Sequence, residues 1–153
     1  MEMARIISKR SRCSRDKVGA VVVSLHNRIV DTGYNGPPAH HFPSRDSDTA
    51  CVNWCSRSLM AQQSVSHGLS LDYSDCPSLH AEANALMFGD RVARQHGTMY
   101  VSSGVCTMCA KLIANSGLMR VVIDMTTTFA HRNVEVGVAF MQQCGLKVDL
   151  VTE

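Results

Sequence analysis

Apolar residues recur along the chain at two spacings, one typical of amphipathic helices and the other typical of short strands. Met3, Ile6 and Ile7 show the helical spacing near the start of the chain. The β-branched runs that follow are bounded by polar turn residues and have the length of strands. The pattern predicts helices over 1–11, 81–88 and 107–115 and another marked by Val134, Val138 and Met141, and strands over 18–25, 28–32, 98–102, 119–124 and 146–151.

The order of these elements predicts the fold class. Two neighbouring strands are expected first, because only His26 and Asn27 separate their apolar runs. After residue 80, strands alternate with helices, which is typical of a layered α/β sheet. The chain has 153 residues, of which 45% are apolar, and this is enough to bury one ordinary core. We therefore expect a single domain over residues 1–153.

The segment between the second predicted strand and His80 breaks this pattern. It begins at the turn residues 33–38, which include two prolines, and residues 39–79 are then polar with little periodicity. A stretch of this length inside a compact domain is typical of a functional loop or of locally cross-linked structure. We expect the chain to leave the sheet at this turn.

Charge and the start of the chain exclude several classes of protein. The formal net charge is +2 and charged residues make up 18%, which argues against long disordered tails and against a protein that mainly coats nucleic acid. No apolar run approaches the roughly 20 residues needed to cross a bilayer. The first ten residues lack the order of a signal peptide. We therefore expect a cytoplasmic protein with no membrane partner and no stable nucleic acid partner.

The cysteine content points to metal chemistry. The chain has seven cysteines and seven histidines, and an odd number of cysteines without a secretory signal favours metal ligands or buried thiols over a disulfide framework. Cys144 is expected to be a core residue, because it follows the apolar face of the last predicted helix.

Two short motifs combine into a candidate catalytic zinc site. His80 and Glu82 open one predicted helix, and Cys106 and Cys109 open another. One imidazole and two thiolates give three zinc ligands and leave a fourth position for water, whose pKa zinc lowers toward about 7. A carboxylate beside that water can move its proton, so the set suits hydroxide attack on an amidine carbon with loss of ammonia. The alternative is a structural zinc or a group of buried thiols.

These motifs resemble the zinc-dependent cytidine and deoxycytidylate deaminases, whose signature is H-x-E with P-C-x-x-C. The segments that carry the resemblance are VGAVVV at 18–23, GYNG at 33–36, HAEANA at 80–85, MYV at 99–101 and CTMCA at 106–110. The GYNG turn and Asn84 are similar to the deoxycytidylate branch. The chain departs from the family at Val105, where proline is usual.

The resemblance implies a fold, a reaction and roles for individual residues. The fold would be a three-layer αβα sandwich of the cytidine deaminase type, with a mixed sheet of about five strands and facing helix N-termini. The enzyme would be a hydrolase that deaminates dCMP to dUMP, releases ammonia and feeds thymidylate precursor supply. It implies that His80, Cys106 and Cys109 hold Zn2+, that Glu82 is catalytic, and that Asn35 and Ala81 bind substrate.

A second zinc and the phosphate contacts are further expectations from the sequence. Some family members carry an additional structural zinc near this insertion, and the alternative here is free thiols. The candidate ligands are Cys13, Cys51, Cys55 and Cys76. A nucleotide substrate needs cations for its phosphate. The candidates are Arg45 and Arg57, followed by Lys17 and Arg28, and a solvated loop charge is the alternative for each. Tyr34 either stacks on a base or fills the core.

Partners and competing functions follow from the same resemblance. Family members assemble through faces beside the active site, so we expect a homo-oligomer, from dimer to hexamer, with dCTP and dTTP as possible effectors. A polynucleotide deaminase acting on tRNA or single-stranded DNA would need a basic groove and stacking aromatics, whereas only 5% of this chain is aromatic. A non-catalytic, zinc-stabilised interaction module is the alternative from a different class.

Overall fold

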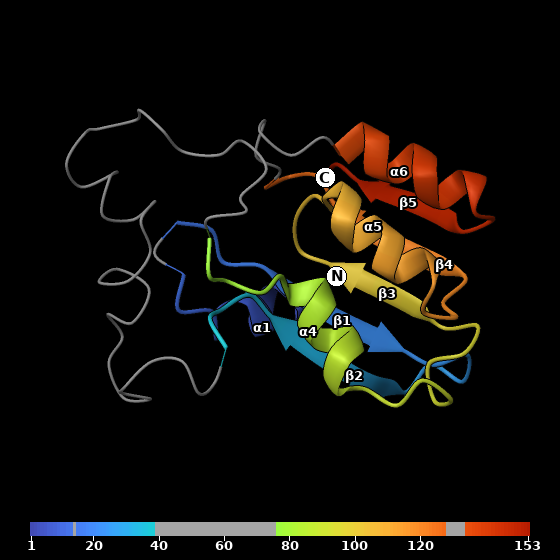
Figure 1. Cartoon of the computed structure of the whole chain (residues 1–153), viewed down its shortest axis with the longest axis horizontal. Coiled ribbons are helices and arrows are strands. Elements are labelled where there is room, and N and C mark those ends of the chain that lie inside the picture. Colours follow the sequence, from blue (N-terminus) through green and yellow to red (C-terminus); the bar gives the residue numbers. More distant parts are fainter. Residues whose placement is uncertain (14, 39–75, 128–133) are drawn as a thin grey trace.

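The protein is built on a five-stranded mixed sheet with helices on both of its faces (Figure 1). This computed structural model describes residues 1–13, 15–38, 76–127 and 134–153. The helices are α1 (Glu2–Ser8), α4 (Ala81–Phe88), α5 (Thr107–Ala114) and α6 (Val134–Gln143). The strands are β1 (Gly19–Val23), β2 (Ile29–Tyr34), β3 (Thr98–Val101), β4 (Arg120–Asp124) and β5 (Lys147–Val151).

Strand directions bring the important loops to one edge of the sheet. The strand order is β2-β1-β3-β4-β5, with β1 antiparallel to both β2 and β3 and with β3, β4 and β5 parallel to one another. The carboxyl ends of β2, β3, β4 and β5 therefore share an edge with the start of β1. This edge, called the carboxyl edge below, also faces the start of α4 and α5 (Figure 1).

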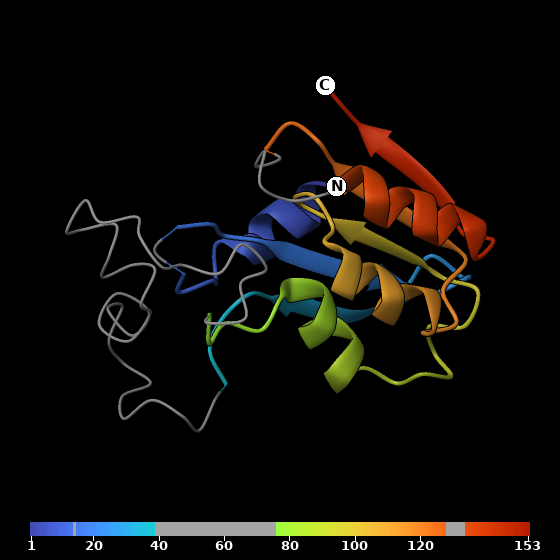
Figure 2. The same ribbon diagram turned by 45° about the horizontal axis from the view of Figure 1, so that its top comes forward.

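Two glycines place helices on opposite faces of the sheet. A Cβ atom on Gly19 would lie 2.2 Å from the carbonyl oxygen of Ala4 in α1, and one on Gly33 would lie 2.2 Å from that of Ala81 in α4. Gly33 pairs with Ala20, the neighbour of Gly19 along β1, and neighbouring strand residues point to opposite faces. The chain therefore has α1 on one face and α4 on the other, as Figure 2 shows, which confirms the predicted three layers.

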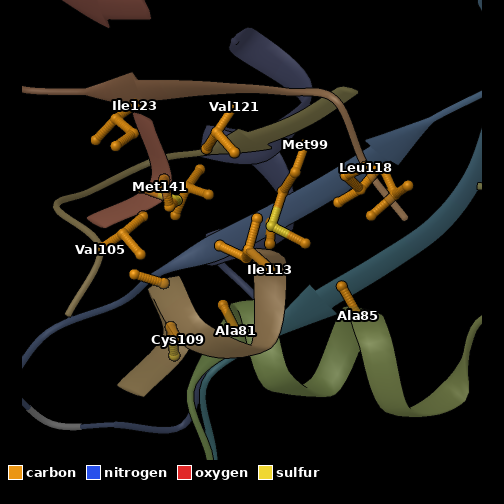
Figure 3. Close-up of a cluster of buried hydrophobic side chains, with 14 of the residues drawn as sticks. Ala81, Ala85, Met99, Val105, Cys109, Ile113, Leu118, Val121, Ile123 and Met141 are labelled. Carbon is orange, nitrogen blue, oxygen red and sulfur yellow. The ribbon is translucent and has the colours of Figure 1, made fainter. Parts of the chain in front are cut away.

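The hydrophobic core lies between the sheet and the layer of α4, α5 and α6. Met99 and Ile123 reach it from β3 and β4, while Ile113 and Met141 reach it from α5 and α6 (Figure 3). All four side chains have no exposed surface. Because the core joins α5 to the sheet, it fixes the position of the helix whose first turn carries the two cysteines.

The predicted elements are all present among the described residues, with shifts at their ends. The first helix ends at Ser8 rather than near residue 11, and Lys9 and Arg10 continue it only as turns. The prediction for Cys144 is wrong, because α6 ends before it and its side chain is exposed. Leu146 takes the buried position instead. Within the described ranges, no helix is long and apolar enough to cross a membrane.

Candidate active site

The predicted zinc ligands stand at the N-termini of two neighbouring helices. His80 is the N-cap of α4 and Cys106 is the N-cap of α5, and both have extended backbone conformations. Cys109 lies in the first turn of α5, where its backbone N–H donates to Cys106 Sγ at 3.5 Å. The positive end of a helix dipole favours thiolate over thiol. The local fold therefore prepares both cysteines to bind a cation.

The distances among the three side chains fit tetrahedral zinc. His80 Nδ1 lies 3.4 Å from Cys106 Sγ and 3.4 Å from Cys109 Sγ, and all three ligand atoms are within 4.8 Å of one another. Zinc bonds of about 2.0 Å to nitrogen and 2.3 Å to sulfur place tetrahedral ligand atoms about 3.5 Å apart. These residues can therefore hold a zinc ion, and no other group of possible ligands is found in the described parts of the chain.

A hydrogen bond couples the thiols of Cys106 and Cys109. A hydrogen bond from Cys109 lowers the pKa of Cys106 to about 3, against the effect of burial and with help from His80. The same hydrogen bond raises the pKa of Cys109, and burial and the charge of Glu82 act in the same direction. The pKa of Cys106 is thus lowered and that of Cys109 is raised by the same contact. Zinc binds cysteine as thiolate, so its binding to both sulfur atoms would release protons.

Glu82 is a buried carboxylic acid beside these ligands. Its side chain is 2% exposed in the first turn of α4, and its hydrogen bond and charge both act on the Cys109 thiol. Burying an acid is unfavourable unless it has polar partners. Its place next to three metal ligands therefore marks it as a group that can accept and deliver a proton.

Asn35 holds the start of β1 at the carboxyl edge. Its side-chain Oδ1 accepts from the N–H of Val18 at 2.8 Å, and its Nδ2 donates to the carbonyl of Asp16 at 2.7 Å. Its backbone carbonyl accepts from Ser11 Oγ at 2.8 Å. The predicted contact to deoxyribose stays a prediction.

The ends of the long insertion meet beside His80. Gly36 and Leu79 form an antiparallel bridge in which Gly36 N–H donates to Leu79 O at 3.1 Å and Leu79 N–H donates to Gly36 O at 2.9 Å. Leu79 directly precedes His80, so this bridge places the base of the insertion against the zinc ligands. The methyl group of Ala81 is buried in the core, and any contact of Ala81 with a substrate must be made by its backbone.

The described residues test only part of the remaining predicted set. Arg45, Arg57, Cys51 and Cys55 lie outside the described residues. Cys13 and Cys76 are described, and both are half-buried. The second zinc and the two arginine contacts therefore stay predictions.

Strand geometry places two residues whose roles the sequence left open. Arg28 lies in the turn between β1 and β2, and β1 has five residues, so this turn is about 15 Å from the carboxyl edge. Arg28 is therefore far from the zinc ligands, while Lys17 precedes β1 at the carboxyl edge. Tyr34 pairs with Gly19, whose face is covered by α1. Tyr34 is thus on the face opposite the zinc ligands.

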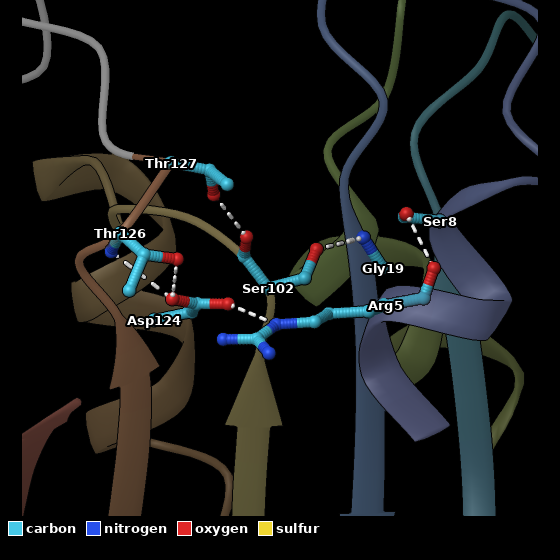
Figure 4. A network of polar contacts seen from close by, with 7 residues as sticks. All are labelled: Arg5, Ser8, Gly19, Ser102, Asp124, Thr126 and Thr127. Carbon is cyan, nitrogen blue, oxygen red and sulfur yellow. Dashed lines mark hydrogen bonds and ion pairs between the residues drawn. The ribbon is translucent and has the colours of Figure 1, made fainter. Parts of the chain in front are cut away.

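A buried carboxylate at the end of β4 was not anticipated from the sequence. Asp124 has no exposed surface; its Oδ2 accepts from Arg5 Nε at 2.6 Å, and its Oδ1 accepts from the backbone N–H and hydroxyl of Thr126 at 3.0 and 2.6 Å (Figure 4). Burial alone would raise the pKa of Asp124, but these bonds outweigh it and the pKa is lowered. The available signal was an acid ending an otherwise apolar strand.

Ser102 links the loop that carries Cys106 to two other segments. Its hydroxyl accepts from the N–H of Gly19 at 2.9 Å, and its carbonyl accepts from Thr127 Oγ1 at 2.7 Å (Figure 4). Val105, at the position where the family usually has proline, is fully buried in the core. The loop between β3 and α5 is therefore held at both of its ends.

A single arginine joins the far ends of the two ligand helices. Arg94 is 7% exposed, and its Nη1 donates to the carbonyl of Leu86 at 2.8 Å and to that of Gly89 at 3.4 Å, at the end of α4. Its Nε donates to the carbonyl of Ser116, just after α5, at 3.4 Å. Zinc ligands connect these helices at one end, and Arg94 connects them at the other.

Comparisons with known proteins agree with this site. Residues 1–125 match the family model of the cytidine and deoxycytidylate deaminase zinc-binding region. A deoxycytidylate deaminase of Mycobacterium phage D29 is 40% identical over 120 residues, which are 78% of this chain and 87% of that protein. A deoxycytidylate deaminase of Enterobacteria phage T4 is 30% identical over 143 residues, covering 80% of this chain and 74% of that protein.

A solved structure shows the same fold. The dCMP deaminase from the cyanophage S-TIM5, in complex with dCMP and dUMP, aligns with a TM-score of 0.65 at 23% sequence identity. The alignment covers 98% of this chain and 92% of that chain. Together with the match over residues 1–125 and the ligand geometry of His80, Cys106 and Cys109, this establishes that the chain belongs to the zinc-binding cytidine and deoxycytidylate deaminase family.

Proposed function

We propose that the protein is a zinc-dependent hydrolase that converts dCMP to dUMP and releases ammonia. The observation that carries the proposal is the placement of a buried Glu82 beside three ligand atoms whose 3.4 Å distances fit zinc. The phage relatives that are 40% and 30% identical are named deoxycytidylate deaminases, which supports dCMP as the substrate. Such a reaction would supply the precursor of thymidylate.

The reaction requires a nucleophile and a proton carrier at one place. Zinc held by His80, Cys106 and Cys109 would supply a water acidic enough to react near neutral pH. Glu82 takes a proton from the attacking water and delivers it to N3 of cytosine as the oxygen adds to C4. Glu82 then carries the second proton to the amino group, which leaves as ammonia. Burial keeps bulk water from competing for these protons.

The test is a panel of substrates scored for released ammonia. It contains dCMP, dCTP, 5-methyl-dCMP, deoxycytidine and a single-stranded cytosine oligonucleotide, each offered to the zinc-loaded protein. We expect dCMP to have the highest kcat/KM. Turnover of the oligonucleotide alone would support the polynucleotide deaminase instead. Bound zinc with no ammonia from any substrate would support the non-catalytic module.

The sequence also assigns the phosphate to Arg45 and Arg57. A charge-assisted hydrogen bond contributes about 1.5–3 kcal/mol, so Arg45→Ala or Arg57→Ala should lower kcat/KM for dCMP about tenfold or more. The loss should be much smaller for deoxycytidine, which has no phosphate. If the ratio of kcat/KM for dCMP to that for deoxycytidine were unchanged in both variants, neither arginine would be a phosphate ligand.

We also propose a homo-oligomer. Large apolar side chains are exposed on α4 and α5, including Phe88 at 80% and Met108 at 65%, which supports a protein partner on this side. Light scattering at micromolar concentration would reveal a monomer if the proposal is wrong. Regulation by dCTP and dTTP, a second zinc and a cytoplasmic location stay predictions of the sequence.

A further inference from the structure

The loop that carries Cys106 begins at Ser102, directly after β3, and its first residue is firmly held. The N–H of Ser102 donates to the carbonyl of Gly19 at 2.9 Å, and its hydroxyl accepts from the N–H of Gly19 at 2.9 Å. Its carbonyl accepts from Thr127 Oγ1 at 2.7 Å. Because a peptide unit is planar, the bond that orients this carbonyl also orients the N–H of Ser103. The chain therefore enters the loop over residues 102–106 in a defined direction.

The other end of this loop is buried against α6. Val105 has no exposed surface. A Cβ atom on Gly137 of α6 would lie 3.0 Å from the carbonyl oxygen of Val105 and 3.7 Å from the carbonyl carbon of Cys106. The missing side chain of Gly137 thus lets α6 approach the backbone at the first cysteine. Only three residues separate Ser102 from Cys106, so a shift at the start of the loop would be passed on to the ligand.

Thr127 belongs to the connection between β4 and α6, and the buried Asp124 shapes that connection. Asp124 Oδ1 accepts from the backbone N–H of Thr126 at 3.0 Å and from its hydroxyl at 2.6 Å. Aspartate commonly forms such a turn by bonding the backbone two residues further on. Thr127 follows this turn directly. The turn therefore sets the place from which the Thr127 hydroxyl reaches Ser102.

Arg5 completes this arrangement from α1. Its Nε donates to Asp124 Oδ2 at 2.6 Å (Figure 4). A carboxylate with no exposed surface is unfavourable unless an opposite charge and hydrogen bonds compensate it. Arg5 and Thr126 supply both, one at each oxygen. Ile123 points into the core beside α5, so its neighbour Asp124 points to the face that α1 covers. The network thus supports the cysteine loop from the face opposite the zinc ligands.

A zinc site tolerates little displacement of its ligands, because zinc–ligand distances stay within about 0.2 Å of their usual values. We infer that Thr127 is a positioning residue for the zinc site. Its hydroxyl, oriented by Asp124, fixes the carbonyl of Ser102 and with it the course of the chain into Cys106. The inference rests on the proposed function in taking this zinc to be catalytic. If these bonds served the fold alone, removing them would lower stability and leave the zinc site unchanged.

The experiment removes one hydroxyl group from the full-length, zinc-loaded protein. Thr127→Val keeps the shape of the side chain but cannot donate to Ser102, whereas Thr127→Ser keeps the donor. Thr32→Val, which removes an exposed hydroxyl from β2, is the matched control. We expect Thr127→Val to weaken zinc binding about tenfold in chelator competition and to lower kcat for dCMP by a similar factor. KM should change little. Thr127→Ser and Thr32→Val should behave like the parent.

Cobalt substitution reports the geometry of the site directly. With Co2+ in place of zinc, the visible absorption bands depend on the arrangement of the ligands. The bands of Thr127→Val should shift from those of the parent, and the bands of Thr127→Ser should not. Asp124→Asn should also weaken zinc binding. Combining it with Thr127→Val should add little, because both changes act on the same contact. Fully additive losses would show that Asp124 does not act through Thr127.

The outcomes separate this inference from the proposed function. Zinc affinity, cobalt spectrum and kcat equal to those of the parent in Thr127→Val would overturn the inference, even if urea unfolded the variant more easily. A defect shared by Thr127→Val and Thr127→Ser would also overturn it, because the hydroxyl would not be its cause. If the parent releases no ammonia from dCMP, the proposed function fails. Zinc affinity and the cobalt spectrum then still decide whether Thr127 positions the site.

Discussion

At the scale of residues, the chemistry depends on four side chains that the sequence places in two local motifs. His80 and Glu82 are two residues apart, and Cys106 and Cys109 are three apart, so each pair is positioned by a single helical turn. Local spacing of this kind can be predicted without a structure. The partners of Asn35 are 17 to 24 residues away in the chain, and no local pattern reveals them.

The role of Glu82 can be separated from metal binding by one substitution. Glu82→Ala should keep its zinc, because the carboxylate is not one of the three ligands, and should lose at least about 100-fold in kcat because proton transfer is lost. Zinc content measured by atomic emission and ammonia release measured with dCMP would show both. Glu135→Ala, on the first turn of α6, is the matched control and should retain activity. Parent-like turnover in Glu82→Ala would refute the assigned role.

At the scale of elements, close approach between a helix and the sheet positions α4. The sequence shows Gly33 as part of a turn motif, but the structure shows that its missing side chain lets Ala81 and Ala85 pack on β2. The apolar pattern predicts both elements but not their contact, because the contact depends on which helix covers which strand. His80 and Glu82 are carried by that same helix, so its distance from the sheet sets their position.

Adding one methyl group at this contact should disturb the site. In Gly33→Ala the new Cβ would lie 2.2 Å from Ala81 O and 2.4 Å from Ala85 N, so α4 must shift. Overpacking of this kind lowers the free energy of unfolding by about 1–3 kcal/mol, and zinc affinity should fall with it. Gly36→Ala is the control, since its Cβ would meet nothing within 4 Å. Urea denaturation measures the free energy of unfolding, and chelator competition measures zinc affinity. Equal values of both quantities in Gly33→Ala and Gly36→Ala would contradict this packing.

Arg94 gives a second test at this scale. Arg94→Lys keeps the charge, but a lysine cannot reach the carbonyls of both helices, and each buried acceptor left without a donor destabilises the fold by about 1–3 kcal/mol. If Arg94 sets the spacing of α4 and α5, the variant should also bind zinc more weakly. Arg120→Lys, at an ion pair with Asp149 that is partly exposed, is the control. Equal losses of stability with and without zinc would show that Arg94 acts on the fold alone.

At the scale of the whole molecule, alternation of strands and helices predicted a layered α/β sheet, and the family resemblance predicted its three layers. Neither predicted the strand order, the face that α1 covers, or the hydrogen bonds that join the connection between α1 and β1 to Asn35. These depend on pairing between distant segments, such as Val18 with Asn35 and Gly36 with Leu79. The ion pair between Arg5 and Asp124 has the same origin, because 119 residues separate its partners.

This ion pair should make the stability of the fold depend on pH. The pKa of Asp124 is lower in the folded protein than its ordinary value of 3.8, so its ionised form stabilises the fold above that value. The contribution is lost as the pH falls through the folded pKa. The urea midpoint of the parent should therefore decrease as the pH is lowered from about 5 to about 3. The midpoint of Asp124→Asn should decrease less steeply over the same range. Identical slopes would show that the buried carboxylate does not contribute as described.

The central claim is that zinc at His80, Cys106 and Cys109 is what allows the protein to deaminate dCMP, and its most direct test is metal reconstitution. The protein is stripped of metal with a chelator, zinc is returned in steps, and ammonia release from dCMP is measured at each step. We expect no turnover without zinc, a rate that rises with bound zinc until the site is filled, and no recovery in Cys106→Ala. Full activity in the stripped protein, or no activity from dCMP at any zinc level, would contradict the account.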